Sequence, residues 1–272
     1  MEPKGCMTFS WDDGHPSDLR VGELLDRHGL NGTFYIPMMA ITGTMQRNHM
    51  RELSQRFEMG GHTLHHLSLV NLSNRLAESE IREGKAWLEE ITGRSCPMFC
   101  PPAGQYGRKH LRMIADAGFA GVRTIELLSL GFPRRVEGLA LMPTTVQAKD
   151  HAPRTVFKHL LKRSSLRGLW NYVVRGGMAA QWESLSRRML ERVAQKGGVF
   201  HLWGHSWELD TQEQWTRLER VLRLMGEMKD RLPCLSNGEV CRRRGGQLHF
   251  PAPCNPKQER GHPEYSGKRA YE

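Results

Sequence analysis

Residues 7–14 read M-T-F-S-W-D-D-G, an apolar run that ends abruptly in two adjacent carboxylates and a glycine. A buried strand that ends in two carboxylates places their negative charge at the edge of a sheet. Further along the chain, G-G-H-T-L-H-H places His62 and His66 four residues apart, and on one helical turn such a pair presents both imidazoles to the same side. Two histidines and a distant aspartate predict a metal site.

Short apolar runs alternate with helical patterns along the chain, which favours an α/β fold with a largely parallel sheet and helices on its outside. The predicted strands are residues 6–11, 32–36, 59–62, 97–100, 119–123, 139–142 and 199–203. The predicted helices are residues 18–28, 73–92 and 108–117, each with a glycine at its end. Because parallel barrels carry their chemistry where the strands end, we expect Asp12, Asp13, His62 and His205 to meet at one rim.

The expected metal ligands are His62 and His66, through neutral imidazole, and Asp13, which completes a facial set of two histidines and one carboxylate. Zinc fits this set, while cobalt, nickel, manganese and iron stay open. Such a site lowers the pKa of bound water toward neutrality, and Asp12 is next door to accept the proton. Since successive side chains on a strand point opposite ways, the chain must leave strand geometry at the two aspartates for both to serve one site. We expect His65 on the surface or behind the ligands.

The formal charge of the 272-residue chain is +10, from 39 basic and 29 acidic residues. This charge attracts an anionic substrate, a membrane surface or nucleic acid without selecting among them. No zinc-finger spacing or RNA-binding signature accompanies it, so we expect no specific nucleic acid partner, and peripheral membrane contact stays open. The chain shows neither a signal peptide nor an apolar run long enough to span a membrane, so we expect a cytoplasmic protein whose six cysteines are reduced.

The length suits one catalytic domain, which we place at residues 1–240, followed by a basic and disordered tail at residues 241–272. Inside the domain, residues 150–182 are predicted to form a basic helical insertion. Its stretch 152–181 holds six Lys/Arg residues, no carboxylate and several large apolar residues. We expect this insertion to pack its apolar side on the barrel, with a membrane contact or a lid as the less favoured alternatives.

Four stretches resemble, in order, the motifs of polysaccharide deacetylases of the NodB-homology type, which form carbohydrate esterase family 4: T-F-S-W-D-D-G, H-T-L-H-H, F-C-P-P-A-G and F-H-L-W-G-H-S-W-E. The resemblance implies a distorted (β/α) barrel with a divalent metal, which hydrolyses the C–N amide bond of an N-acetylated sugar. It implies that Asp12 is the general base, that Asp13, His62 and His66 bind the metal, and that His205 is the general acid. The implied substrate is an acetylated sugar, a nucleotide sugar or a lipid-linked glycan.

The third motif departs from the family pattern at two positions. Cys100 stands where the family usually has an arginine that orients the base, so Asp12 needs another partner, for which Arg123 in the next predicted strand is the candidate. Ala103 replaces a common aromatic residue, which opens that side of the pocket and counts against a polymeric substrate. The backbone N–H of Ala103 is still expected to stabilise the oxyanion together with the metal. Trp203 is expected either to stack on a sugar ring or to pack in the core, as is Trp207.

Three alternatives stay open. The same site would serve an O-acetyl ester or formamide hydrolase. A second reading makes Cys100 a nucleophile with His205 as its base. In the third, the barrel is catalytically weakened and acts as a glycan-binding protein, although the retention of both aspartates and all three histidines argues against it. The sequence does not indicate the oligomeric state.

Overall fold

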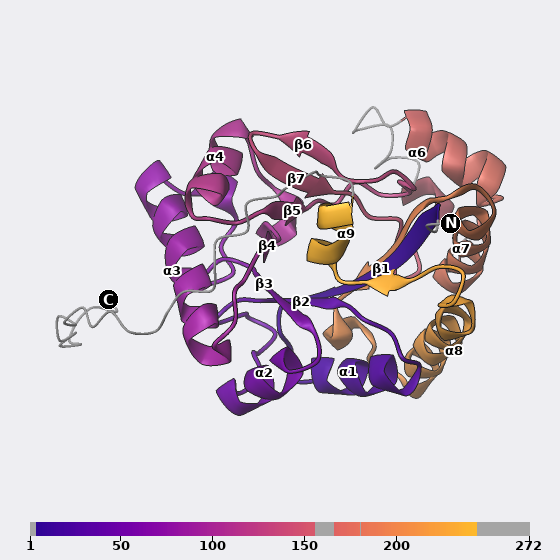
Figure 1. The fold of residues 1–272 in the computed structure, drawn as a ribbon, viewed down its shortest axis with the longest axis horizontal. Coiled ribbons are helices and arrows are strands. Elements are labelled where there is room, and N and C mark those ends of the chain that lie inside the picture. Colours follow the sequence, from indigo (N-terminus) through magenta and orange to yellow (C-terminus); the bar gives the residue numbers. More distant parts are fainter. Residues whose placement is uncertain (1–3, 156–165, 180, 244–272) are drawn as a thin grey trace.

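The structure, a computed structural model, describes residues 4–155, 166–179 and 181–243. Its strands form one curled sheet in the order β6-β7-β5-β4-β3-β2-β1-β9-β8, with β10 added beside β1, and every pair is parallel except β6 and β7 (Figure 1). The strands are β1 (Gly5–Asp12), β2 (Thr33–Ile36), β3 (Glu58–Gly61), β4 (Met98–Phe99), β5 (Gly121–Arg123), β6 (Arg134–Val136), β7 (Leu139–Met142), β8 (Val146–Gln147), β9 (Gly198–Gly204) and β10 (Cys234–Leu235). The predicted α/β fold with a distorted parallel barrel is confirmed.

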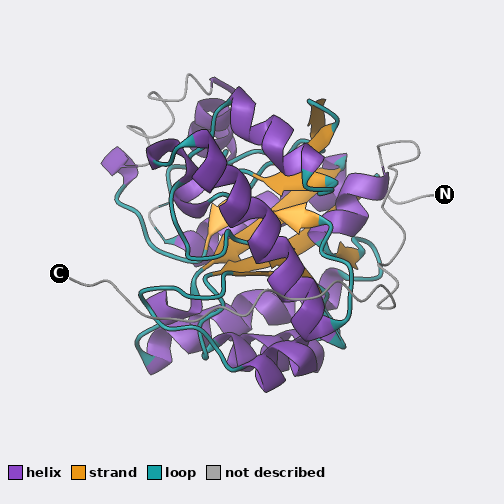
Figure 2. Cartoon of the chain, turned by 90° about the vertical axis from the view of Figure 1, so that its left-hand side faces the viewer, coloured by secondary structure: helices purple, strands orange, loops and turns teal. Residues whose placement is uncertain are grey.

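Helices cover the outside of the sheet, which Figure 2 shows from the side. They are α1 (Asp18–Arg27), α2 (Arg47–Ser54), α3 (Asn74–Thr92), α4 (Arg108–Asp116), α6 (Leu166–Trp170), α7 (Trp182–Lys196), α8 (Gln212–Met228) and α9 (Asn237–Arg243). The three predicted helices match α1, α3 and α4 to within one residue at each end. Their glycine stops, Gly29, Gly93 and Gly118, all adopt the left-handed backbone that ends a helix.

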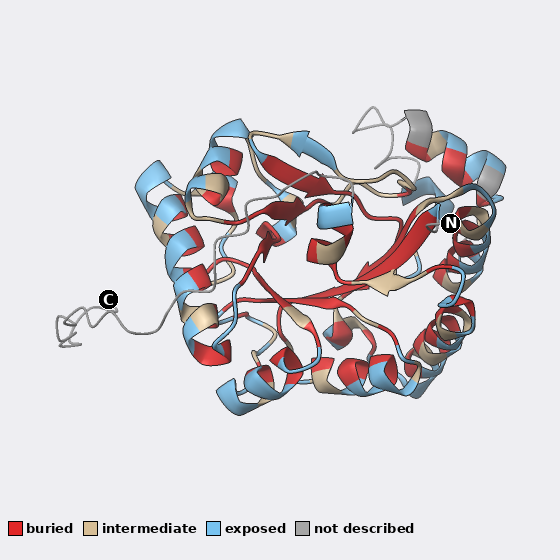
Figure 3. Cartoon of the chain, in the orientation of Figure 1, coloured by how far each residue is buried: buried red, intermediate tan, exposed pale blue. Residues whose placement is uncertain are grey.

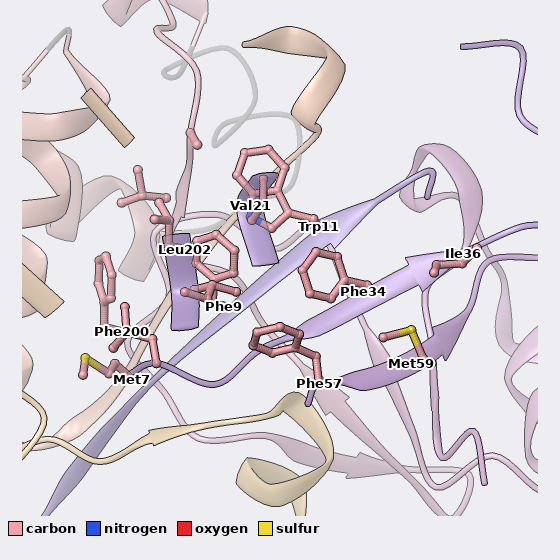
Figure 4. Close-up of a cluster of buried hydrophobic side chains, with 14 of the residues drawn as sticks. Met7, Phe9, Trp11, Val21, Phe34, Ile36, Phe57, Met59, Phe200 and Leu202 are labelled. Carbon is pink, nitrogen blue, oxygen red and sulfur yellow. The ribbon is translucent and has the colours of Figure 1, made fainter. Parts of the chain in front are cut away.

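Alternation along β1 separates the core from the site. Met7, Phe9 and Trp11 face outward, where they pack with residues of β2, β9 and the helices in the cluster of Figure 4. The residues between them point into the barrel because side chains alternate along a strand, and this inner row ends at Asp12. Figure 3 shows the result: the strands other than β6 and β10 are almost entirely buried, and the helices are buried only on the side toward the sheet. The main core therefore lies between sheet and helices. A smaller apolar cluster inside the barrel packs inward-facing strand residues against α9, which leaves the carboxyl rim for polar groups.

The amino end of the barrel is closed by α9, which lies within the curve of the sheet in Figure 1 and contacts β1, β5 and β7. Asn237 fixes this helix from its first residue: its amide nitrogen donates to the hydroxyl of Thr8 at 2.8 Å, and its amide oxygen accepts from the hydroxyl of Tyr35 at 2.8 Å. With this end closed, the open end of the barrel is the carboxyl rim of the strands.

The predicted division at residue 240 and the insertion at residues 150–182 stay predictions, since residues 156–165, 180 and 244–272 lie outside the described part. Within it, α6 and a π-helical turn at Asn171–Arg175 occupy the predicted insertion. The five described cysteines are free thiols, and Cys254 lies outside the described residues. Among the helices that the structure describes, none has the length and apolar character needed to cross a membrane.

Candidate active site

The end of β1 brings two carboxylates into one site. Asp12 is the last residue of the strand, and Asp13 leaves strand geometry with a φ of 77°. Gly14 follows with a φ of 62°, and a Cβ at this position would lie only 2.7 Å from Cγ2 of Ile36. Only glycine adopts such a backbone next to so close a neighbour without strain. The chain thus leaves the strand where the sequence requires it.

The predicted helical turn that carries His62 and His66 is wrong. Residues 62–66 form an irregular loop after β3, with left-handed φ angles of 60° at Thr63 and 56° at His66. This loop folds back on itself, so the two imidazole ring centroids lie 4.8 Å apart. The histidines meet through local backbone reversal and not through helical periodicity.

Glu80 of α3, which was not predicted as a site residue, holds this loop in place. Its Oε2 accepts hydrogen bonds from the backbone N–H groups of Leu64 at 3.0 Å and His65 at 2.8 Å, and its Oε1 lies 2.7 Å from Nδ1 of His65. Gly84, one turn later in α3, lets the helix approach the loop, because a Cβ there would lie 2.8 Å from the carbonyl carbon of Thr63. His65 therefore faces α3, behind the ligand pair.

Three donor atoms converge on one point. The Nδ1 of His62 donates to the carbonyl oxygen of Cys100 at 2.6 Å, which leaves the lone pair of Nε2 directed at Asp13. Oδ1 of Asp13 lies 3.3 Å from Nε2 of His62 and 3.0 Å from Nε2 of His66. It is buried and has no hydrogen-bond partner among the described residues. Donors bound to one ion at about 2.1 Å are about 3.0–3.4 Å apart, so this set fits a divalent metal.

The surroundings keep Asp13 ionised. Burial opposes its charge, but when no cation is bound, hydrogen bonds and positive charge from the protonated imidazoles of His62 and His66 more than offset burial and hold the pKa of Asp13 well below its usual range. Its second oxygen, Oδ2, accepts a hydrogen bond from Nε1 of Trp207 at 2.8 Å. One oxygen is therefore oriented by the indole, and the other is left for a cation.

Arg123 is the partner of Asp12. Its guanidinium is fully buried at the end of β5 and donates from Nη2 to Oδ2 of Asp12. Burial disfavours the charged guanidinium, yet the neighbouring carboxylate holds the pKa of Arg123 above its ordinary value. Sγ of Cys100 lies 3.8 Å from the same carboxylate oxygen. Cys100 gives the third motif no positive charge beside Asp12, and Arg123 of β5 supplies that charge instead.

The thiol of Cys100 is a poor nucleophile where it stands. Its side chain is buried, and burial raises the pKa of the thiol well above its usual value. Because the thiolate is the reactive form, an enclosed neutral thiol does not suit covalent catalysis. The alternative that makes Cys100 the nucleophile is therefore not favoured.

His205 directly follows β9, which pairs with β1 on the edge opposite to β2, so its imidazole approaches Asp12 from the β9 side. Its Nε2 lies 3.9 Å from Oδ2 of Asp12, and its Nδ1 lies 3.0 Å from Oε2 of Glu208. Burial would lower the pKa of His205, but the carboxylate of Glu208 and the aspartates outweigh burial and raise it. Lys149 in turn lies 2.6 Å from Oε1 of Glu208. Glu208 lies in the fourth motif but was not predicted to have a role.

The remaining candidates divide by exposure. Trp203 is buried, with the guanidinium of Arg123 4.7 Å from its ring centroid, so it packs rather than stacks on a ligand. Trp207 is partly exposed beside Asp13 and stays available to a sugar ring. Ala103 lies exposed in the turn that follows Cys100, with a left-handed φ of 54°. Its predicted role, in which its backbone N–H donates a hydrogen bond to the oxyanion, stays a prediction.

The comparisons with known proteins agree with this geometry. Residues 1–122 match the family model described as polysaccharide deacetylase, and the resemblance inferred from the motifs is confirmed. A search of curated proteins gave no match.

Solved structures extend the agreement over most of the chain. One is a protein of Mycobacterium smegmatis that carries the provisional name polysaccharide deacetylase. The alignment covers 89% of this chain and 91% of that protein's chain, with a TM-score of 0.66 and 15% identity. The chitin deacetylase of Colletotrichum lindemuthianum aligns over 88% of both chains, with a TM-score of 0.55 and 12% identity. A pseudoenzyme of carbohydrate esterase family 4 from Bacillus anthracis aligns over 88% of this chain and 66% of its own, with a TM-score of 0.53 and 14% identity. At these identities the likeness shows the fold, and activity has to be argued from the site.

Proposed function

Because residues 1–122 carry a polysaccharide deacetylase sequence and the described chain has the fold of solved family members, we propose that this protein is a metal-dependent deacetylase of N-acetylated sugars. The observation that carries the proposal is the convergence of Oδ1 of Asp13 with Nε2 of His62 and of His66. A divalent metal held by these atoms would act as a Lewis acid toward water and the acyl oxygen. We favour zinc for this donor set, with cobalt, nickel, manganese and iron as alternatives.

Asp12 is the proposed general base. Amide hydrolysis needs a group that takes a proton from the attacking water, and the carboxylate of Asp12 stands beside the proposed ligands at the carboxyl end of β1. The buried pair with Arg123 fixes the orientation of this carboxylate. Its free oxygen, Oδ1, has no hydrogen-bond partner among the described side chains and is left to meet the water.

His205 is the proposed general acid. The departing amine must be protonated, and Glu208 keeps His205 in the form that can do so, because it favours the imidazolium and accepts from Nδ1. The Nε2 proton is then the one that His205 delivers. The backbone N–H of Ala103 is proposed to donate to the oxyanion.

The substrate class is an acetylated sugar, free, on a nucleotide or on a lipid. A cytoplasmic location, expected from the sequence, is part of this proposal. Hydrolysis of an O-acetyl ester or a formamide by the same residues is the second candidate, but the family match and the neighbours named as deacetylases favour acetamide.

Acetate release from a panel of acetamido sugars, their nucleotide conjugates and lipid-linked forms tests the proposal, with O-acetyl and formamido analogues beside them. The wild-type protein should release acetate from an acetamido sugar. Asp12→Asn should keep the metal and lose turnover, whereas His66→Ala should lose both. His49→Ala, which changes a half-buried histidine of α2 outside the site, is the matched control and should keep both. No release from any acetamido substrate by metal-loaded protein would refute the proposal.

A further inference from the structure

Large apolar side chains are exposed around the mouth of the candidate site. We call this set the apolar rim: Met38, Met39, Ile41, Leu67, Val70 and Trp207. Its members come from three connections that leave the carboxyl ends of β2, β3 and β9, at the rim that carries the site. The side chain of Met39 is 57% exposed and that of Ile41 is completely exposed.

Backbone and side-chain hydrogen bonds connect the apolar rim to the proposed metal ligands. The backbone N–H groups of Met38 and Met39 both donate to the carbonyl oxygen of Leu64, which lies between His62 and His66 in sequence. Leu67 directly follows His66, and Trp207 donates to Asp13. The rim is therefore built onto the site, and whatever covers it also faces the reacting group.

The turn that carries Ile41 is held in place at both ends. The N–H of Ala40 donates to the hydroxyl of Thr44 at 2.9 Å, and the N–H of Met45 donates to the carbonyl oxygen of Gly14 at 2.8 Å. A turn anchored in this way presents Ile41 to solvent in a fixed position. Exposing a large aliphatic side chain on an ordered turn costs free energy unless a partner covers it.

The charge around the rim selects the kind of partner. Residues 27–51 and 59–77, which carry five of the six rim residues, contain no aspartate or glutamate. They do contain Arg75, which is exposed at the start of α3, whereas the guanidinium of Arg47 lies 3.9 Å from Glu90 in the last turn of that helix. Next to Trp207, the carboxylate of Glu208 is balanced by Lys149 and His205. Apolar side chains beside Arg75, on stretches without a carboxylate, match a surface with an apolar interior and an anionic outer layer, which is an anionic lipid bilayer.

We propose that the apolar rim docks the mouth of the site on an anionic membrane surface, so that the acetylated sugar that the protein takes is attached to a lipid. Aliphatic side chains enter the upper bilayer, the indole of Trp207 lies at the interface, and Arg75 contacts the head groups. The part concerning the substrate rests on the proposed deacetylase function, whereas the docking does not.

Vesicle co-sedimentation tests the docking directly. We expect the wild-type chain to bind vesicles of phosphatidylcholine with phosphatidylglycerol, to bind pure phosphatidylcholine more weakly, and to lose affinity as salt is raised. Met39→Glu/Ile41→Glu should lower the affinity by about tenfold or more, because two apolar side chains are replaced by charges of the same sign as the lipid. Val174→Glu is the matched control: Val174 is 56% exposed but lies outside the rim, so this variant should bind as the wild type does.

Three results would overturn the docking proposal: no vesicle binding by the wild type, equal loss in the rim variant and the control, or a wild-type dimer that the rim variant dissociates. The last result would assign the rim to a second copy of the chain. Thermal unfolding and metal content of each variant show whether it is folded. Vesicle binding without acetate release from any sugar would refute the deacetylase and leave the docking intact. Acetate release from soluble sugars without vesicle binding would refute the docking and leave the deacetylase function intact.

Discussion

Replacing Arg123 by methionine should destabilise the protein by about 3–5 kcal/mol, because it leaves a buried carboxylate without its counter-charge. Arg123 is completely buried, and Asp12 is only 4% exposed, so solvent does not screen the pair. Methionine keeps most of the side-chain volume, which limits the part of the effect that comes from a cavity. Since whole domains are stable by about 5–15 kcal/mol, a change of this size is easily measured.

A double-mutant cycle in urea, on metal-free protein, separates the pair from its surroundings. The variants are Arg123→Met, Asp12→Asn and both together. The double variant should be markedly more stable than the sum of the single effects predicts, because neither charge is then left buried alone. Arg56→Met is the control, since Arg56 pairs with Asp26 at the surface and should contribute no more than about 1 kcal/mol. If the two single effects add to within about 0.5 kcal/mol, the pair does not orient Asp12 in the way we describe.

Three further predictions concern other residues. Burial lowers the pKa of His201 to about 3 from 6.5, so the unfolded chain binds a proton that the folded chain does not as the pH falls below 6.5. The free energy of unfolding should therefore decrease by up to about 1.4 kcal/mol for each pH unit below 6.5. Urea titrations at several pH values should show a weaker pH dependence of this free energy for His201→Gln than for the wild type. An equal pH dependence in the two proteins would contradict the prediction. Glu208→Gln should lower the pKa of His205 and move the alkaline limb of kcat/KM to lower pH at unchanged metal content; an unmoved limb would remove Glu208 from the mechanism. Gly84→Ala should favour α3 by about 1 kcal/mol yet weaken metal binding by calorimetry, because its Cβ would press on the backbone of Thr63; unchanged affinity would show that the loop yields.

The sequence predicts the outer frame of the fold well, because periodicity and glycine stops are local signals. The ends of α1, α3 and α4 follow from apolar spacing and from the left-handed glycines after them. Helices α2, α7 and α8 were not predicted as elements. Neither was α9, whose position depends on contacts of Asn237 with Thr8 and Tyr35 that are distant in sequence.

Within the site, the motifs identify the chemical groups but not how the backbone presents them. The spacing of His62 and His66 suits a helical turn, yet Glu80 binds two backbone N–H groups of the loop and favours a reversed chain instead. One signal for Glu80 was present: it is a carboxylate beside Ile81 on the buried face of an amphipathic helix, where charge is normally avoided. Arg123 could be named as a partner for Asp12 because a missing charge has to be replaced, whereas the pairing of His205 with Glu208 needed the turn after β9.

Metal content of the purified protein tests the central claim most directly, measured for the wild type beside the His62→Ala/His66→Ala double variant. We predict about one divalent ion per wild-type chain and none above background in the variant, since two of the three donors are removed. Equal metal content in the two proteins, or a wild-type chain that binds no divalent ion even after zinc or cobalt is supplied, would contradict the account.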